Sequence, residues 1–155
     1  MAISNDATLQ NSAATGFIEI IDNGATFEDT IIPNPTNSLT VNLGNAGDLL
    51  NVTTLDADYA ASLIVNGGFD FDTVQLNAVN LDTANSGRGL WVTETEILSV
   101  TGGTISNNTA LIGGGILIDN ATSIFGTIAT LDGVTVTGNA ATGGTAPTQG
   151  GGGIF

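Results

Sequence analysis

The feature that most restricts the fold of this chain is an internal repeat of about 24 residues. The segments SLTVNLGNAGD (Ser38 to Asp48) and SLIVNGGFDFD (Ser62 to Asp72) align without gaps and share 6 of 11 residues. The same offset of 24 separates Val52 from Leu76 and Leu76 from Val100. A unit this short cannot bury an apolar face alone, so successive units must stack on one another.

The repeat continues toward the end of the chain in three further segments, LNAVNLDTAN, VTGGTISNNT and LDGVTVTGNA. They place Leu81, Ile105 and Val136 at equivalent positions, and each is followed by a glycine-rich stretch, GRGLWV, GGGILI or GGGIF. Within a unit, apolar residues alternate with Thr, Asn or Ser over four or five positions and then meet a Gly or Asn turn. This alternation indicates short β-strands, and no segment keeps helical spacing for three turns.

We therefore predict an all-β protein, a parallel β-helix (β-solenoid) with rungs of about 24 residues, right-handed by fold precedent. Its interior would be a column of Leu, Ile and Val. Asn at the corners tolerates left-handed backbone angles, and stacked Asn amides can hydrogen-bond between rungs. The expected ladder pairs are Asn42 with Asn66 and Asn108 with Asn139.

The two ends are expected to differ. Residues 1–37 fit the repeat poorly, with a strand at Gly16 to Asp22 and a break at the proline-containing stretch Ile31 to Asn37. We interpret 1–37 as an N-terminal cap or an irregular first rung, and 38–155 as β-helix repeats with no cap at the C-terminal end. Two interpretations of that end are open: the chain is a fragment of a longer adhesin, or it is a full protomer whose apolar Ile154 and Phe155 associate end to end with a second copy.

Composition excludes several function classes. Fifteen acidic residues against one basic residue give a formal charge of -14, which argues against nucleic acids and anionic membrane surfaces as partners. The chain has no Cys and no His, so thiolate chemistry, common zinc sites and Ser-His-Asp catalysis are not available to it. No apolar run reaches the roughly 18 residues of a membrane span, so we expect no membrane insertion.

Two pairs of short motifs resemble a known family. ISNN (Ile105 to Asn108) precedes GGGI (Gly113 to Ile116), and VTGN (Val136 to Asn139) precedes GGGI (Gly151 to Ile154). These pairs resemble the repeats of the chlamydial polymorphic outer-membrane proteins, which combine FxxN with GGA[ILV]; here Ile or Val replaces Phe, and Gly replaces Ala. The resemblance implies a β-helical passenger domain of an autotransporter-type bacterial surface adhesin.

Three aspartates form a candidate metal site. Asp70 and Asp72 stand two residues apart, so on a strand they would share one face, and Asp48 would stack near Asp72. Stacked carboxylates repel unless a proton or cation intervenes, and Ca²⁺ prefers oxygen ligands. The stretch GGFDFD is also similar in part to the calcium-binding GGxGxD repeat of RTX proteins. The alternative is a solvated acidic turn.

A carboxylate-dependent polysaccharide hydrolase is the enzyme class that this composition permits, and Asp70, Asp72 and Asp82 are its candidate residues. Polysaccharide lyases of β-helix fold need basic groups, and this chain supplies only Arg88. Arg88 and nearby Trp91 could bind a sugar. Alternatively, Arg88 pairs with acids and Trp91 fills a corner of the core.

The resulting hypothesis is a non-catalytic structural or adhesive β-helix module of a bacterial surface protein, located outside the cell or on its surface. Its partners would be further copies of itself, stacked end to end into filaments, or a host or matrix glycan or protein. No cofactor is required, although calcium binding fits the acidic cluster. The alternative is the polysaccharide hydrolase.

Overall fold

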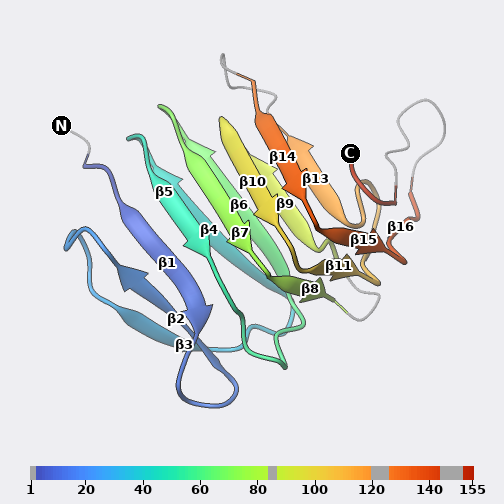
Figure 1. Ribbon diagram of the computed structural model, residues 1–155, viewed down its shortest axis with the longest axis horizontal. Helices are drawn as coiled ribbons and strands as arrows, with labels where there is room; N and C mark the ends of the chain where they lie inside the picture. The colour runs from blue at the N-terminus through green and yellow to red at the C-terminus, as the bar shows by residue number, and fades with distance from the viewer. Residues whose placement is uncertain (1–2, 84–86, 120–125, 144–151) are drawn as a thin grey trace.

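The computed structural model describes residues 3–83, 87–119, 126–143 and 152–155, and the regular structure in these ranges is entirely β-strand (Figure 1). The expected all-β class is therefore confirmed. Most strands pair in parallel, and within the described ranges they form four open sheets. No helix of the length and apolar character needed to cross a bilayer occurs in these ranges.

The largest sheet has seven strands, which run in parallel except at the N-terminal edge, where two antiparallel pairings add the last two strands. In sheet order these strands are β14 (Ile128–Asp132), β10 (Ile97–Thr101), β7 (Thr73–Asn77), β5 (Leu49–Val52), β1 (Asp6–Asn11), β2 (Phe17–Asp22) and β3 (Thr30–Pro33).

The other three sheets are wholly parallel. The four-stranded sheet contains β13 (Ile116–Asp119), β9 (Leu90–Thr93), β6 (Ser62–Gly68) and β4 (Ser38–Gly44). The three-stranded sheet contains β15 (Thr135–Thr137), β11 (Thr104–Ser106) and β8 (Asn80–Asp82). The two-stranded sheet contains β12 (Thr109–Ala110) and β16 (Ala140–Ala141).

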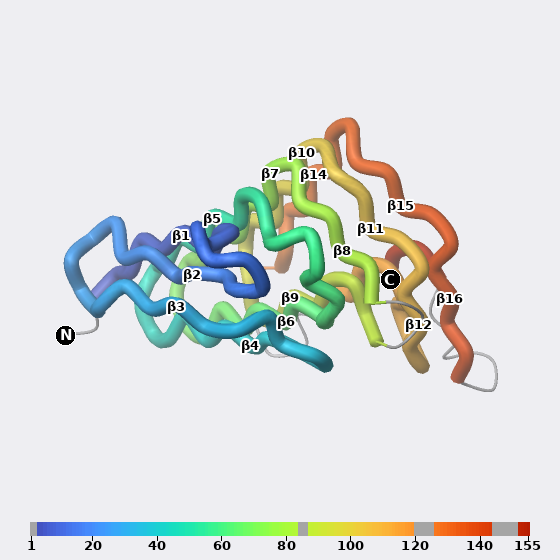
Figure 2. The backbone as a smooth tube through the Cα atoms, turned by 90° about the horizontal axis from the view of Figure 1, so that it is seen from below, coloured from blue at the N-terminus to red at the C-terminus, as the bar shows by residue number. Residues whose placement is uncertain are grey.

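From β4 onward the chain forms a strand of the four-stranded sheet and then a strand of the seven-stranded sheet. From β6 onward it adds a strand of the three-stranded sheet before it returns to the four-stranded sheet. We call each such passage a level: β4–β5, β6–β8, β9–β12 and β13–β16. Figure 2 shows β5, β7, β10 and β14 of the seven-stranded sheet on the opposite side of the molecule from β4, β6 and β9 of the four-stranded sheet, with β8, β11 and β15 to one side between them. Each new level thus pairs with the level before it.

The register between levels follows the repeat. Val52 pairs with Leu76, Leu76 with Val100, and Val100 with Leu131. The first three of these side chains are at most 2% exposed, and they lie in one continuous core cluster. The predicted column of aliphatic side chains is therefore observed, because equivalent positions of successive levels lie side by side.

The repeat length is less constant than predicted. It is 24 residues from β4 to β6, where Leu39 pairs with Leu63, but 27 from β6 to β9, where Leu63 pairs with Leu90. It reaches 31 from β10 to β14, where Ile97 pairs with Ile128. The extra residues lie between strands, so the pairing of the strands themselves is preserved.

Two glycines show how closely the levels approach at the turns. Gly44 and Gly68 are paired between β4 and β6, with φ of 118° and 107°. A Cβ at Gly68 would overlap the carbonyl oxygen of Gly44. Glycine is required here both for this backbone angle and for the close approach.

The N-terminal segment joins the seven-stranded sheet in a different way. β1 pairs in parallel with β5, whereas β2 and β3 follow it as an antiparallel meander. The predicted strand at Gly16 to Asp22 is confirmed as β2, but the predicted break is wrong for Ile31 to Pro33, which belong to β3. Because β3 is an edge strand, Pro33 can end it without removing an inner hydrogen bond.

The register predicts the effect of cavity mutations. Leu76→Ala removes buried methyl groups between Val52 and Val100, so it should reduce the free energy of unfolding by about 2 to 5 kcal/mol. Gln75→Ala, one residue away and half-buried, should cost about 0.5 kcal/mol or less. Urea unfolding of both variants measures these values. Equal decreases in the free energy of unfolding for the two variants would contradict the buried column of aliphatic side chains.

Candidate functional site

The most unusual polar feature is a row of stacked carboxyl groups at the turns that lead from the four-stranded to the seven-stranded sheet. We call Asp48, Asp72 and Glu96 the acid ladder. The backbone N–H of Asp48 donates to Asp72 Oδ1 at 2.8 Å, and that of Asp72 donates to Glu96 Oε2 at 2.8 Å. At the N-terminal end of the ladder, the backbone N–H of Asn5 donates to Asp48 Oδ1 at 2.5 Å. Asp72 and Glu96 therefore each hold the backbone of the preceding level, and Asp48 holds the N-terminal segment at Asn5.

The acid ladder is buried. Asp48, Asp72 and Glu96 are 3%, 0% and 2% exposed, respectively. Burial raises the pKa of Asp72 to about 6, and the neighbouring acids Asp48 and Glu96 add to the increase, whereas the hydrogen bond from Asp48 opposes it. The expected stacking of Asp48 on Asp72 is thus confirmed, and a solvated acidic turn is wrong for these two residues.

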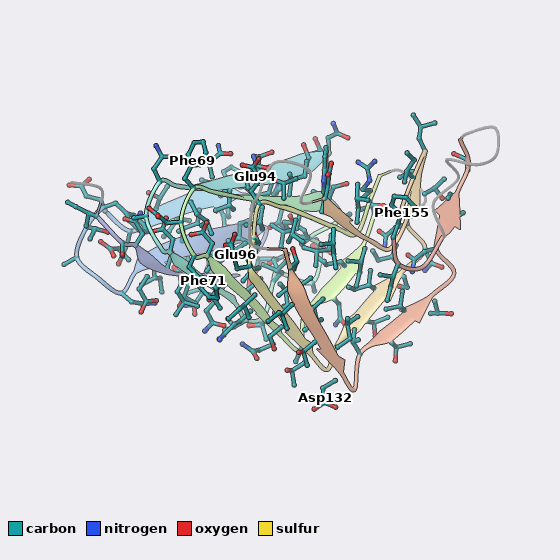
Figure 3. The ribbon with its side chains drawn as sticks, turned by 90° about the horizontal axis from the view of Figure 1, so that it is seen from above. Phe69, Phe71, Glu94, Glu96, Asp132 and Phe155 are labelled. Atoms are coloured by element: carbon teal, nitrogen blue, oxygen red, sulfur yellow. The ribbon has the colours of Figure 1, made fainter. Side chains whose placement is uncertain are left out.

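Asp70 takes a different position from Asp72. It has φ of 77° in the turn between β6 and β7, and it is exposed, so the expectation of one shared face is wrong. Strand alternation does not extend through this turn. Figure 3 shows the turn's Phe69 and Phe71 at the same corner as Glu94 and Glu96, away from Asp132 and Phe155.

The structure does not bring the three proposed calcium ligands Asp48, Asp70 and Asp72 together as a group. Within the described ranges, no cluster of three or more His, Cys, Asp or Glu side chains is arranged to hold a metal ion. Asp48 and Asp72 instead direct one oxygen each to a backbone N–H group.

A second ladder, formed by the amides of buried Asn108 and half-buried Asn139, follows the three-stranded sheet. Asn108 Oδ1 accepts the backbone N–H of Thr83 at 2.9 Å, and Asn139 Oδ1 accepts that of Asn108 at 3.0 Å. The amide nitrogens donate in turn, from Asn108 to Leu81 O and from Asn139 to Ile105 O. We call Asn108 and Asn139 the amide ladder; their predicted pairing is confirmed, with Asn108 Nδ2 also 2.8 Å from Asn139 Oδ1.

The other predicted asparagine pair lies on the outside. Asn66 Nδ2 donates to Asn42 Oδ1 at 2.6 Å, and Thr93 Oγ1 donates to Asn66 Oδ1 at 2.8 Å. Asn42 is exposed, so water competes for its hydrogen bonds. The same residue type therefore forms one ladder in the core and one on the surface.

Of the three carboxylates suggested for hydrolysis, Asp82 is separated from Asp70 and Asp72. Asp72 precedes β7, whereas Asp82 ends β8, so the whole of β7 lies between them. Five strand residues span roughly 15 Å, beyond the separation of about 5 to 9.5 Å that glycosidase carboxyl pairs use. Asp82 Oδ2 accepts hydrogen bonds from Asn107 Nδ2 and Ser106 Oγ.

Arg88 and Trp91 lie together on the outer face of the four-stranded sheet. The guanidinium carbon is 4.5 Å from the centroid of the Trp91 ring, and Arg88 Nε donates to Ile112 O at 2.9 Å. Trp91 is half-buried and alternates with core residues Leu90 and Val92, so it does not fill a corner of the core. Burial lowers the pKa of Arg88, and the charge of Asp119 opposes that effect.

Ile154 and Phe155 lie beside β13 at the C-terminal end of the sheets. Ile154 forms a parallel bridge with Ile116, and Phe155 N–H donates to Ile116 O at 3.0 Å. Their side chains are 47% and 53% exposed, and Ile128 on the edge strand β14 is 68% exposed. Among the described residues, this end therefore presents exposed apolar side chains and the edge strand β14.

Sequence reasoning missed Glu96 and Asp56. Glu96 stands 24 residues after Asp72, so the repeat spacing alone could have identified it as a ladder member. Asp56 accepts hydrogen bonds from Gly16 N, Asn34 Nδ2 and Asp58 N at 2.8 to 3.1 Å. No repeat spacing marks Asp56, because its distant partners Gly16 and Asn34 lie outside the repeats.

Comparison with known proteins adds no relative: the chain matches no protein-family model, no curated protein and no solved structure.

The two asparagine ladders make different contributions to stability. Asn108→Ala removes the acceptor of the Thr83 N–H and the donor to Leu81 O in the core, so it should reduce the free energy of unfolding by about 2 to 4 kcal/mol. Asn42→Ala on the surface should cost about 0.5 kcal/mol or less. Chemical unfolding measures the free energy of unfolding of both variants. Comparable decreases in the two variants would show that burial does not determine how much a ladder contributes to stability.

Proposed function

We propose that this chain is a right-handed parallel β-helix that serves as a non-catalytic structural or adhesive module of a bacterial surface protein, outside the cell. The observation that carries the proposal is the in-register pairing of four successive levels. Such stacking gives a rigid body whose outer surface is available for contacts. The net charge of -14 would limit lateral clumping of such bodies.

The N-terminal meander fits the role of a cap. Ile18 is fully buried, and Ile20 and Ile32 pack against the core cluster, so β2 and β3 cover apolar surface at that end. Figure 2 shows β1, β2 and β3 at the N-terminal end of the molecule. β3 is therefore the outermost strand of the seven-stranded sheet at this end.

Asp56 fastens this cap to the first level. Its carboxylate, which follows β5, binds Gly16 in the β1–β2 connection and Asn34 after β3. Hydrogen bonds from Asp58, Asn34 and Gly16 lower the pKa of Asp56 below 3.8. Its contribution to stability is therefore present above about pH 3.8 and is lost as the pH falls through the lowered pKa.

Removing this carboxylate should loosen the cap selectively. In Asp56→Ala at pH 7, hydrogen exchange should accelerate in β2 and β3 but not in β9 and β10, because the missing acceptor contacts only the meander and its neighbour. Asp58→Ala is the matched control, since its side chain is exposed. Uniform acceleration, or none in β2, would contradict the role of Asp56.

The opposite end suits association with a second copy. β14 forms the free edge of the seven-stranded sheet, and exposed Ile128, Ile154 and Phe155 surround this end. At the other edge, β3 runs in the same direction as β14, because β2 is antiparallel to both β1 and β3. A head-to-tail contact would therefore continue a parallel sheet and, since it does not close, would build filaments.

Electron microscopy over a concentration series tests this function. We expect elongated assemblies, which should be shortened or lost in the Ile128→Asp and Phe155→Asp variants. Phe69→Asp is the matched control, because Phe69 is 74% exposed but lies on a turn away from this end, and it should assemble normally. Monodisperse short particles at high concentration would reject the filament.

The adhesive role has a separate readout. Binding of the purified protein to immobilised matrix glycans and proteins should be detectable without release of reducing ends. Release of reducing ends from neutral polysaccharides, abolished by Asp82→Asn, would instead establish the hydrolase. If the protein neither assembles into filaments nor binds any of these glycans or proteins, the proposed function is overturned.

A further inference from the structure

The acid ladder and the amide ladder perform the same structural task with different chemistry. In both, a side-chain oxygen accepts the backbone N–H of the preceding level. The second atom of each amide also has a partner, since Asn108 Nδ2 donates to Leu81 O and Asn139 Nδ2 to Ile105 O. In the acid ladder, the buried Oδ2 atoms of Asp48 and Asp72 have no hydrogen-bond partner among the described residues.

An ionised carboxylate cannot complete such a ladder. It only accepts hydrogen bonds, whereas a protonated carboxyl group also donates one, as an amide does. Burial of an unpaired charge is also far more costly than burial of a neutral polar group. Protonation of Asp72 would thus supply the missing donor and remove the charge.

The surroundings of Asp72 favour the proton as well. The titratable groups that act on it are Asp48 from the turn of the first level, Glu96 from the turn of the third level, and Asp70 from its own turn. All three are acids. Stacked levels are about 4.8 Å apart, so ionised ladder carboxylates would repel one another at short range. The chain's one basic residue, Arg88, is stacked on Trp91 instead.

We propose that Asp72 is a neutral carboxylic acid in the folded protein in mildly acidic medium, and that the acid ladder is a proton-dependent clasp between successive levels, at the turns that join the four-stranded to the seven-stranded sheet. In a mildly acidic medium Asp72 is protonated and the contacts of the acid ladder are strongest. An alkaline medium ionises Asp72 and weakens the corner where β6 turns into β7. The stiffness of the module would thereby depend on the pH of its surroundings.

The direction of the pH dependence follows from linkage. The pKa of Asp72 is raised from 3.8 to about 6 by burial, so the folded state binds this proton more tightly than the unfolded state. The stability that the proton confers is complete below about pH 3.8 and is lost as the pH rises through about 6. These two values predict a fall of roughly 10-fold in the folding equilibrium constant between pH 5 and pH 8. Asp56 acts in the opposite direction but below about pH 3.8, outside this window.

Equilibrium unfolding in urea between pH 5 and pH 8 tests the proposal with two matched variants. Asp72→Asn replaces the acid with the residue of the amide ladder, and it should abolish most of the roughly 10-fold dependence. Asp70→Asn removes the same charge from an exposed position in the same turn, and it should keep that dependence. A wild-type dependence that survives Asp72→Asn, or that Asp70→Asn removes, would overturn the proposal.

A reciprocal substitution and a direct readout complete the test. Asn108→Asp converts the amide ladder into an acid ladder, so its folding equilibrium constant should fall more steeply with rising pH than that of the wild type. Carbon-13 NMR of the Asp72 carboxyl carbon in the folded wild-type protein reports protonation without any mutation, and it should show a midpoint near 6. A midpoint near 4 would overturn the proposal. These measurements use the monomer in solution, so they do not depend on filament formation or adhesion.

Discussion

The structure depends on parallel hydrogen bonding between equivalent positions of successive levels. Once Val52 pairs with Leu76 and Leu76 with Val100, the other residues of those strands also lie beside their counterparts. Each position must therefore be compatible with a copy of itself. Aliphatic residues meet this condition by forming a column, and glycines meet it at the crowded turn, where Gly68 lies over Gly44.

Polar residues meet the same condition only when every stacked group finds a partner. The amides of Asn108 and Asn139 do so, because an amide both accepts and donates and can link three levels. The buried carboxyl groups of Asp48 and Asp72 do not, because each leaves its Oδ2 without a hydrogen-bond partner among the described residues; under our proposal this makes the corner at Asp72 sensitive to pH. The surface pair Asn42 and Asn66 is less constrained, since water can replace a missing partner.

Much of the arrangement could be predicted from the spacing of residues. An offset of 24 gave the aliphatic column, the stacking of Asp48 on Asp72 and the Asn42–Asn66 pair, because in-register stacking converts a sequence offset into a contact. Glu96 fits the same offset but differs in residue type from Asp72, so similarity of residues did not reveal it.

The remaining features could not be predicted because they do not repeat. The positive φ of Asp70 breaks strand alternation in a turn, and alternation was the basis for placing it beside Asp72. The attachment of β2 and β3 depends on Asp56 and its distant partners Gly16 and Asn34, which no periodic pattern connects. Pro33 signals the end of a strand, but only the position of β3 at a sheet edge shows why a strand is tolerated there.

The register itself can be measured directly, because the chain has no cysteine of its own. Gln75 and Ser99 are paired neighbours on β7 and β10, whereas Gln75 and Thr101 are two positions out of register. The double variant Gln75→Cys with Ser99→Cys should form an intramolecular disulfide readily under mild oxidation, since neighbouring strand positions lie within bridging distance. Gln75→Cys with Thr101→Cys should not. Equal cross-linking of the two variants, or failure of the in-register one, would contradict the stacked arrangement.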